Sequence, residues 1–430
     1  MNRDLGKIVR DLRTVDWDFP VQFSGTSRIV HWYPGTYPPE LPATLLQAFS
    51  SQDDIIFDPY AGAGTTGAEA VRFGRRALLV ESNPIGAASS YGLTGLVLLK
   101  SIRPELLAPL FDSLEAAFSR ANRARTTGML LGLDEWYQRE IDRSLSRVIT
   151  PTPEAFLQVV KPNAPRWHLL RPWFDKRTLQ QVRKAISFAV DAQQGSFCKL
   201  LGLLAVSGVL RAASSQTKSW GHIADNVLPK RLTEKDLFSL LVTWVGRARA
   251  MITSLELVRP NVGSERRVAV VAHSWNADGA SSFRNPFRDK SLLLVTSPPY
   301  ANAIDYTLSQ RLSLYLFGYS DDVVAQMVAK EIGARRKRFS SCAETTWGEE
   351  LNRSLIAQLK LLDTEAHIAM VLPHRDAGRD VGKERLSEAL KEHGWTELFR
   401  VNRSIRQSRT RQSWTSIKKE TIYVYRHANL

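Results

Sequence analysis

The sequence has few residues of the kinds that build disulfide scaffolds or metal sites. Only two cysteines, Cys198 and Cys342, occur among 430 residues, and they lie far apart. The eight histidines form neither an HxxxH pattern nor an HxE…PCxxC pattern. These absences exclude a disulfide framework, a zinc ribbon and the signatures of zinc hydrolases and zinc deaminases. The sequence therefore predicts no metal site.

Long apolar runs are also scarce. The most apolar stretch, LLGLLAVSGVL at 200–210, is shorter than the roughly 20 residues of a bilayer-spanning helix. The first residues, MNRDLGKIVRDLR, lack the apolar core of a signal peptide. We therefore expect a cytoplasmic protein with no membrane partner.

Positive charge is the unusual feature of the composition. Lysine and arginine number 58 against 43 acidic residues, which gives a net charge of +15. The hydrophobic share of 43% is that of a globular protein. Such an excess of positive charge favours a polyanionic partner, with nucleic acid the first candidate and an acidic membrane surface the second.

Apolar runs that end in turn residues predict a sheet. The predicted strands lie at 53–57, 75–81, 266–274, 291–297, 366–373, 395–401 and 420–426. The first two are separated by a glycine-rich turn and a helical segment, which is the opening of a Rossmann-like, doubly wound α/β fold. The last two strands are expected to form an antiparallel pair at the C-terminal edge of the sheet.

The predicted sheet is interrupted by a mostly helical segment. We divide the chain into 1–99, the first part of a catalytic domain that binds a donor, 100–265, a helical insertion, and 266–430, the second part with the catalytic turn and the final strands. The insertion is a candidate target-recognition region, and a mainly structural role for it is the alternative.

The first turn, DPYAGAGTTG at 58–67, follows a buried strand, and Glu81 ends the next one. Glycines allow a ligand to approach the backbone, and an acid at the second strand end accepts ribose hydroxyls. Asp58 would repel a pyrophosphate, which argues against NAD, and suits a ligand that carries a positive charge. S-adenosylmethionine is such a ligand. A tight turn that binds nothing is the alternative.

The second turn, TSPPY at 296–300, also ends a buried strand. Two prolines stop the strand and contribute no N–H groups. In an open α/β sheet both turns lie at the carboxyl ends of strands and are expected to face one crevice. A strand-terminating loop with a packed tyrosine is the alternative.

Together these turns resemble the motifs of amino-methylating DNA methyltransferases. DPYAGAGTT resembles their donor motif, DPFxGxGTT, and TSPPY resembles their catalytic motif, in which Ser, Asp or Asn precedes Pro-Pro and an aromatic residue. The serine resembles the cytosine-N4 enzymes more than the adenine-N6 enzymes. HWYPGTYPPELP at 31–42 resembles the segment that closes over the donor. The resemblance covers about 1–95 and 266–430, with the donor motif first.

The resemblance implies roles for particular residues. A cytosine base rotated out of double-stranded DNA would stack on Tyr300, and its amino group would be held by the Ser297 hydroxyl and the Pro298 carbonyl. The implied catalytic residues are Ser297, Pro298, Pro299 and Tyr300. The implied S-adenosylmethionine-binding residues are Asp58, Pro59, Tyr60, Gly62, Gly64, Thr65, Thr66, Glu81 and Asn83.

One strand departs from the family pattern. The third strand usually ends in an acidic residue that contacts the donor's adenine, but here His273 and Ser274 stand at that position and Asp278 follows. Beyond the second turn, Asn302, Asp305 and Tyr306 are expected either to line the pocket or to act as caps and turn residues.

Two basic clusters, 334–339 and 400–414, are candidate DNA contacts. The residues predicted to bind DNA are Arg335, Arg336, Arg403, Arg406 and Arg409. A solvated loop is the alternative for the second cluster. The polar loop at 211–226 is a further candidate for recognition or phosphate binding.

The sequence thus predicts a cytosine-N4 DNA methyltransferase that uses S-adenosylmethionine. An adenine-N6 DNA methyltransferase, an RNA methyltransferase and a catalytically silent DNA-binding subunit are the alternatives, and a dehydrogenase is retained only if NAD binds. A cognate restriction or defence-system protein is a further candidate partner.

Overall fold

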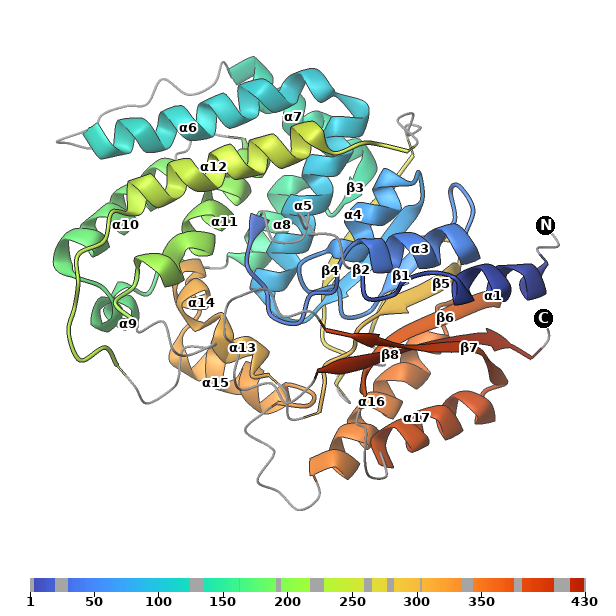
Figure 1. Cartoon of the computed structure of the whole chain (residues 1–430). Helices are drawn as coiled ribbons and strands as arrows, with labels where there is room; N and C mark the ends of the chain where they lie inside the picture. Colours follow the sequence, from blue (N-terminus) through green and yellow to red (C-terminus); the bar gives the residue numbers. More distant parts are fainter. Residues whose placement is uncertain are drawn as a thin grey trace.

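The protein is described here from a computed structural model of the whole chain (Figure 1). The described residues are 4–19, 30–123, 135–161, 163–190, 195–216, 228–258, 265–276, 282–301, 304–334, 343–374, 381–405 and 418–428.

A single eight-stranded sheet runs through the molecule in the order β3-β4-β2-β1-β5-β6-β8-β7. The strands are β1 (Ile55–Asp58), β2 (Arg76–Glu81), β3 (Ile149–Thr150), β4 (Val268–Ala272), β5 (Ser291–Thr296), β6 (Leu362–His374), β7 (Trp395–Ser404) and β8 (Lys419–His427). All neighbours pair in parallel except β8, which is antiparallel to both β6 and β7. The predicted Rossmann-like fold and its antiparallel C-terminal pair are confirmed.

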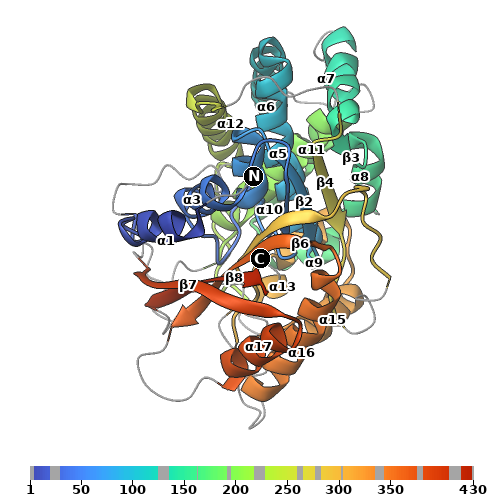
Figure 2. The same ribbon diagram turned by 90° about the vertical axis from the view of Figure 1, so that its right-hand side faces the viewer.

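Side chains alternate between the two faces of the sheet, and each face has its own core. In β1, Ile56 belongs to one hydrophobic cluster, while Ile55 and Phe57 belong to the other. The first face is covered by α1 (Leu5–Arg13), α3 (Glu40–Phe49), α4 (Thr65–Arg72) and α5 (Pro84–Ile102), and the second by α16 (Ala343–Leu359) and α17 (Val381–Glu392). Figures 1 and 2 show the two layers on opposite sides of the strands.

The helical segment between β2 and β4 lies on the same side of the sheet as α5 and packs against that helix. Its elements are η1 (Pro104–Leu106), α6 (Leu107–Arg123), α7 (Glu135–Val148), α8 (Pro153–Val160), α9 (Trp167–Leu170), η2 (Arg171–Trp173), α10 (Lys176–Ala189), α11 (Ser196–Ala213) and α12 (Leu237–Ser254). It is mostly helical, as predicted, but it also contributes the two-residue strand β3 to the edge of the sheet.

Helix α5 lies between the sheet and these helices. It contacts β2 and β4 on one side and α7, α8, α11 and α12 on the other. Every residue from Pro84 to Leu99 is buried. Its side chains share one continuous hydrophobic cluster with both layers. The predicted boundary at 99/100 falls inside this helix, and the three-part division stays a prediction.

Two described helices, α5 and α11, are long and apolar enough to cross a membrane. We expected the apolar stretch at 200–210 to be too short, but α11 extends it to 18 residues. Most of each helix is buried inside the protein: 83% of the most apolar 18-residue stretch of α5, and 72% of that of α11. Core helices of globular proteins have these properties, so the two helices are weak evidence for a membrane span.

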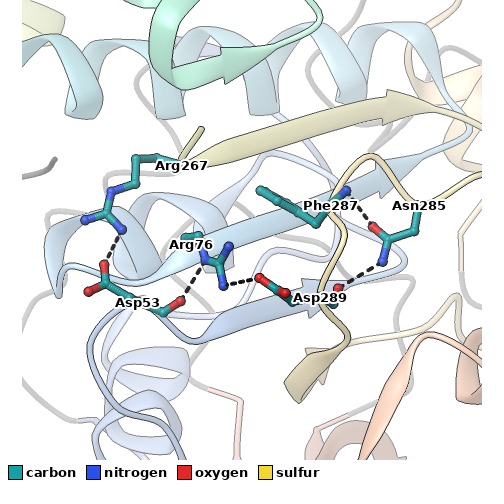
Figure 3. A network of polar contacts seen from close by, with 6 residues as sticks. All are labelled: Asp53, Arg76, Arg267, Asn285, Phe287 and Asp289. Atoms are coloured by element: carbon teal, nitrogen blue, oxygen red, sulfur yellow. Dashed lines mark hydrogen bonds and ion pairs between the residues drawn. The ribbon is translucent and has the colours of Figure 1, made fainter. Parts of the chain in front are cut away.

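A polar network ties together the amino ends of four strands (Figure 3). The Arg76 guanidinium donates to the Asp53 carbonyl at 2.7 Å and pairs with Asp289 at 2.9 Å. The Asp53 carboxylate pairs with Arg267, whose side chain is only 5% exposed. Asn285 donates to the Asp289 carbonyl at 3.3 Å. These residues precede or begin β1, β2, β4 and β5, and the network therefore fixes the end of the sheet opposite the carboxyl ends.

We expect Asp53→Ala to lower the free energy of unfolding by about 1–3 kcal/mol, because it leaves the buried Arg267 guanidinium without its carboxylate. Urea titration measures this change. The matched control is Asp289→Ala, whose carboxylate is 64% exposed and whose loss should cost less than about 1 kcal/mol. Equal effects of the two substitutions would contradict this prediction.

Candidate functional site

A cavity lies at the carboxyl ends of the parallel strands. It is lined by the turns that follow β1, β2, β4 and β5, by residues 33–37, and by residues of α13 (Tyr306–Ser309), α15 (Asp321–Lys330) and the segment after α15. The two predicted turns, around Asp58 and Ser297, therefore face the same cavity, as expected from the fold.

Asp58 ends β1 and is 2% exposed. Its carboxylate accepts hydrogen bonds from Thr66 Oγ1 and Thr296 Oγ1, both at 2.6 Å, and from the Tyr60 backbone N–H at 3.2 Å and the Tyr37 hydroxyl at 3.3 Å. Burial raises the pKa of Asp58, and these donors oppose the rise. The carboxylate thus joins the β1 turn to the last residue of β5.

The glycines after Asp58 adopt conformations that other residues disfavour. Gly62 has φ of 52° and Gly64 has φ of 87°. A Cβ atom on Gly64 would lie 2.6 Å from Ser90 Cα in α5. Gly64 caps α4, which begins at Thr65. The turn is therefore held tightly against the start of α5.

Glu81 ends β2 and also faces the cavity. It accepts hydrogen bonds at 2.8 Å from the backbone N–H groups of Gly62 and Asn83. Burial raises the pKa of Glu81 to about 7 despite these donors. Asn83 caps α5 by accepting from the Ile85 N–H at 2.9 Å, and Pro84 occupies the first turn of that helix.

The amide nitrogen of Asn83 is buried, and it has no hydrogen-bond partner among the described residues. An orphan donor beside the Glu81 carboxylate fits a ligand with hydroxyl or ring-nitrogen acceptors, as in a nucleoside. The residues at this end of the cavity are therefore compatible with S-adenosylmethionine.

The segment at 31–42 lies along the cavity, and Tyr33, Pro34, Gly35, Thr36 and Tyr37 all line it. The Tyr37 hydroxyl also contacts Thr66 Oγ1. His31 is buried against the helical segment, with Nε2 2.8 Å from Ser207 Oγ in α11. The structure places part of this segment on the cavity wall, and its closing over a donor stays a prediction.

The residues directly after β4, His273, Ser274 and Trp275, line the cavity. The Trp275 indole donates to the Pro59 carbonyl at 2.8 Å and packs edge-on against Phe57. Asp278 lies outside the described residues.

The turn after β5 places Ser297 and Pro299 on the cavity wall, while Pro298 is buried behind them. Tyr300 is 8% exposed, and its hydroxyl donates to the buried Glu420 carboxylate at 2.7 Å. The Ser297 hydroxyl donates to Tyr300 Oη at 3.0 Å. Tyr300 is absent from the described residues that line the cavity.

Tyr306 lines the cavity and stacks on Tyr33, with ring centroids 6.3 Å apart. Its backbone N–H donates to Glu331 at 2.7 Å, and the Thr307 N–H donates to the same carboxylate. Asp305 is buried just before α13. Asn302 lies outside the described residues.

The structure argues against one predicted DNA contact. Arg403 is 6% exposed, and its guanidinium pairs with Glu420 at 2.7 Å and donates to the Trp17 carbonyl. The register of β7 and β8 places Arg403 opposite Glu420, so this arginine points into the protein instead of into solvent. Arg335, Arg336, Arg406 and Arg409, together with residues 217–226 of the polar loop, lie outside the described residues.

A second hollow, on the helical segment, gathers basic and aromatic side chains. It is lined by Pro165, Arg166, Trp167, His168, Arg171 and Arg183. The Arg183 guanidinium lies 5.0 Å from the centre of the Trp167 ring. Trp167 is half-buried, and the combination of arginines with a partly accessible aromatic ring suits contact with nucleic acid.

Several residues of the cavity carried no motif that we singled out. Trp275, Lys330 and Glu331 line the cavity, and Glu420 contacts Tyr300 behind the turn after β5. Thr296 belongs to TSPPY, but its bond to Asp58 was not predicted, although a polar residue placed directly at a strand end could have indicated it. Glu420 has no such signal, because its contact depends on the strand register.

Comparison with known proteins supports the motif interpretation. Residues 10–87 match the family model N6_N4_Mtase, described as a DNA methylase. The match supports a DNA amino-methyltransferase and does not distinguish cytosine N4 from adenine N6. A methyltransferase subunit of a type I restriction-modification system from Streptococcus thermophilus aligns with 80% of this chain and 83% of its own, at 11% identity. The TM-score of this alignment is 0.21.

We expect Gly64→Ala to destabilise the protein by about 1–3 kcal/mol, because its positive φ and the 2.6 Å approach to Ser90 leave no room for Cβ. Urea titration checks this value. Gly246→Ala is the matched control, since a Cβ there meets nothing within 4 Å and alanine favours the α12 helix by up to about 1 kcal/mol. A neutral Gly64→Ala would contradict the geometry described here.

Proposed function

We propose that this protein transfers a methyl group from S-adenosylmethionine to the N4 amino group of cytosine in double-stranded DNA. The observation that carries the proposal is that the turn after β1 and the turn after β5 face one cavity and are joined by the bond between Thr296 and Asp58. The family match over residues 10–87 supports the same activity at the level of DNA amino-methylation.

The charge of the cavity supports a cationic donor. Among the described residues, its wall contains the carboxyl groups of Asp58, Glu81 and Glu331 and one ammonium group, that of Lys330. S-adenosylmethionine, when bound, supplies a methyl group on a sulfonium centre. In this proposal Glu81 accepts hydrogen bonds from the ribose hydroxyls, and the side-chain amide of Asn83 donates to a polar atom of the nucleoside. The glycine turn allows the ligand to approach the backbone closely. Pro59, Tyr60 and Thr65 line this side of the cavity, while Thr66 is buried and supports the site through its bond to Asp58.

The turn after β5 supplies acceptors for the amino group of the target base. We assign this role to the Ser297 hydroxyl and the Pro298 carbonyl, with Pro298 and Pro299 offering no competing N–H groups. Acceptors at both N–H bonds would orient the nitrogen toward the methyl group. A base must leave the duplex to reach this cavity. Stacking on Tyr300 stays a prediction, and Tyr306 presents its ring to the cavity in the present conformation.

The choice of cytosine over adenine rests on Ser297, by resemblance. Adenine N6 of DNA is therefore the second candidate, because the same acceptors would serve either amino group. An RNA methyltransferase and a catalytically silent subunit are the further alternatives. Duplex DNA as partner is supported by the net charge of +15 and by the arginine-lined hollow. A cytoplasmic location and a restriction or defence-system partner belong to the same proposal.

The test is expression in a host without DNA methylation, followed by mapping of modified bases. We expect N4-methylcytosine at one short sequence and none with Ser297→Ala, while S-adenosylmethionine still binds that variant. N6-methyladenine would replace the cytosine assignment with its alternative. Absence of methyl transfer to both DNA and RNA, together with absence of donor binding, would favour the silent subunit.

We also expect the affinity for S-adenosylhomocysteine to rise with pH up to about 7 and then level off. Glu81 has its pKa raised to about 7 by burial, and ribose hydroxyls donate to its ionised form, so binding below pH 7 must release a proton. The expected change is at most about tenfold per pH unit. Calorimetry from pH 5.5 to 8.5 measures it.

The control for this prediction is Glu81→Gln, which should bind more weakly at pH 8 and lose the dependence on pH. Because both proteins meet the same ligand, the titration of the ligand itself cancels in the comparison. The same pH profile in both proteins would exclude Glu81 as the titrating group.

A further inference from the structure

We propose that Glu420 is a positioning residue that fixes the direction of a buried hydrogen-bond chain and so presents Ser297 Oγ to the cavity as an acceptor. The inference rests on the proposed function, because an acceptor is what the amino group of a base requires. It adds a residue from β8 to the site, 123 positions after Ser297 in the chain.

The chain runs through four side chains. Arg403 donates to one oxygen of Glu420 at 2.7 Å, and the Tyr300 hydroxyl donates to the other at 2.7 Å. Ser297 Oγ lies 3.0 Å from Tyr300 Oη, and Ser297 is one of the residues that line the cavity. The chain therefore begins at an ion pair inside the protein and ends at the cavity wall.

With Glu420 ionised in its pair with Arg403, the chemistry of the groups permits one direction. A guanidinium has donors and no acceptor, so it always takes a Glu420 oxygen. An ionised carboxylate only accepts, so Tyr300 must give its single proton to Glu420. Ser297 must then give its own proton to Tyr300. The lone pairs of Ser297 Oγ are left for the cavity, where they can accept from an N–H group.

Burial keeps water from competing for these bonds. Tyr300, Arg403 and Glu420 are each less than 10% exposed. Arg403 is held further by its bond to the Trp17 carbonyl at 3.1 Å, and it faces Glu420 directly in the β7–β8 register. The Pro299 carbonyl accepts from the Trp347 indole at 2.8 Å, which fixes the turn from another side. The direction of the chain is thus set by the protein and not by solvent.

The informative substitution is Glu420→Gln. An amide beside Arg403 must turn its oxygen toward the guanidinium, so its NH₂ group faces Tyr300. Tyr300 then accepts from the amide and donates to Ser297, whose proton points into the cavity toward the amino group. We expect kcat for methyl transfer to fall roughly 10- to 100-fold. The KM for DNA and the Kd for S-adenosylhomocysteine should stay within about twofold.

The matched control is Glu397→Gln, a substitution of the same kind on β7 at a carboxylate that is 37% exposed and pairs with Arg400. It should leave kcat unchanged. A fall in kcat and in ligand affinity together, or an equal fall in the control, would overturn the proposal.

A double substitution separates positioning from structural support. Tyr300→Phe removes the link between Glu420 and Ser297 and frees the serine hydroxyl to rotate. In the Tyr300→Phe background, Glu420→Gln should cause no additional loss, and the double variant should be more active than Glu420→Gln alone. Losses that simply multiply would mean that Glu420 supports the fold and does not direct the chain.

NMR spectroscopy can test the direction of the hydrogen-bond chain without any methyl transfer. In protein labelled at the tyrosine ring, we expect a slowly exchanging, downfield hydroxyl resonance that disappears in Tyr300→Phe and moves upfield in Glu420→Gln. If the resonance behaves so but no nucleic acid is methylated, the proposed function fails while the chain stands. If the resonance is unchanged in Glu420→Gln, the chain is wrong whatever the enzyme methylates.

Discussion

The arrangement of the site depends on one buried carboxylate, that of Asp58. It accepts hydrogen bonds from Thr66 at the start of α4, from Thr296 at the end of β5, and from Tyr37 in the segment that lies along the cavity. Removing a carboxylate from water is costly, and burial accordingly raises the pKa of Asp58. The donors from these three elements together offset part of this cost, and their bonds hold the elements at this point.

The tyrosines around the cavity lie close to its carboxyl groups. Burial raises the pKa of Tyr60 to about 12 and raises the pKa values of Tyr33, Tyr37 and Tyr306 as well. These phenols therefore remain protonated at neutral pH and can act as donors. Tyr33 donates to Glu81, Tyr37 donates to Asp58, and Tyr60 contacts Ser354 and Gln358 in α16. Tyr33 and Tyr37 are thus uncharged hydrogen-bond donors to Glu81 and Asp58, and they do not neutralise the charge of these carboxylates as a lysine or arginine would.

Much of this fold is predictable because its strands are short apolar runs that end at polar residues. β1 and β2 end at Asp58 and Glu81 as the sequence indicates, whereas β6 begins at Leu362, four residues earlier than predicted, because residues 363–365 are polar and at least partly exposed. The two-residue strand β3 has no periodic pattern to detect. The burial of Arg403 could not be predicted, since it depends on which residue of β8 lies opposite it. Local sequence patterns therefore predict the turns, whereas the side chains that contact the turns from inside the protein depend on the pairing register of the strands.

Helix α5 connects the site to the rest of the chain in another way. Its first residue follows Asn83 at the cavity, and its whole length is enclosed between the sheet and the helical segment. Without that segment, the apolar outer side of α5 would face water. The helices of this segment and α5 therefore form one packed unit, and a chain that lacked the segment would need a more polar outer side on α5.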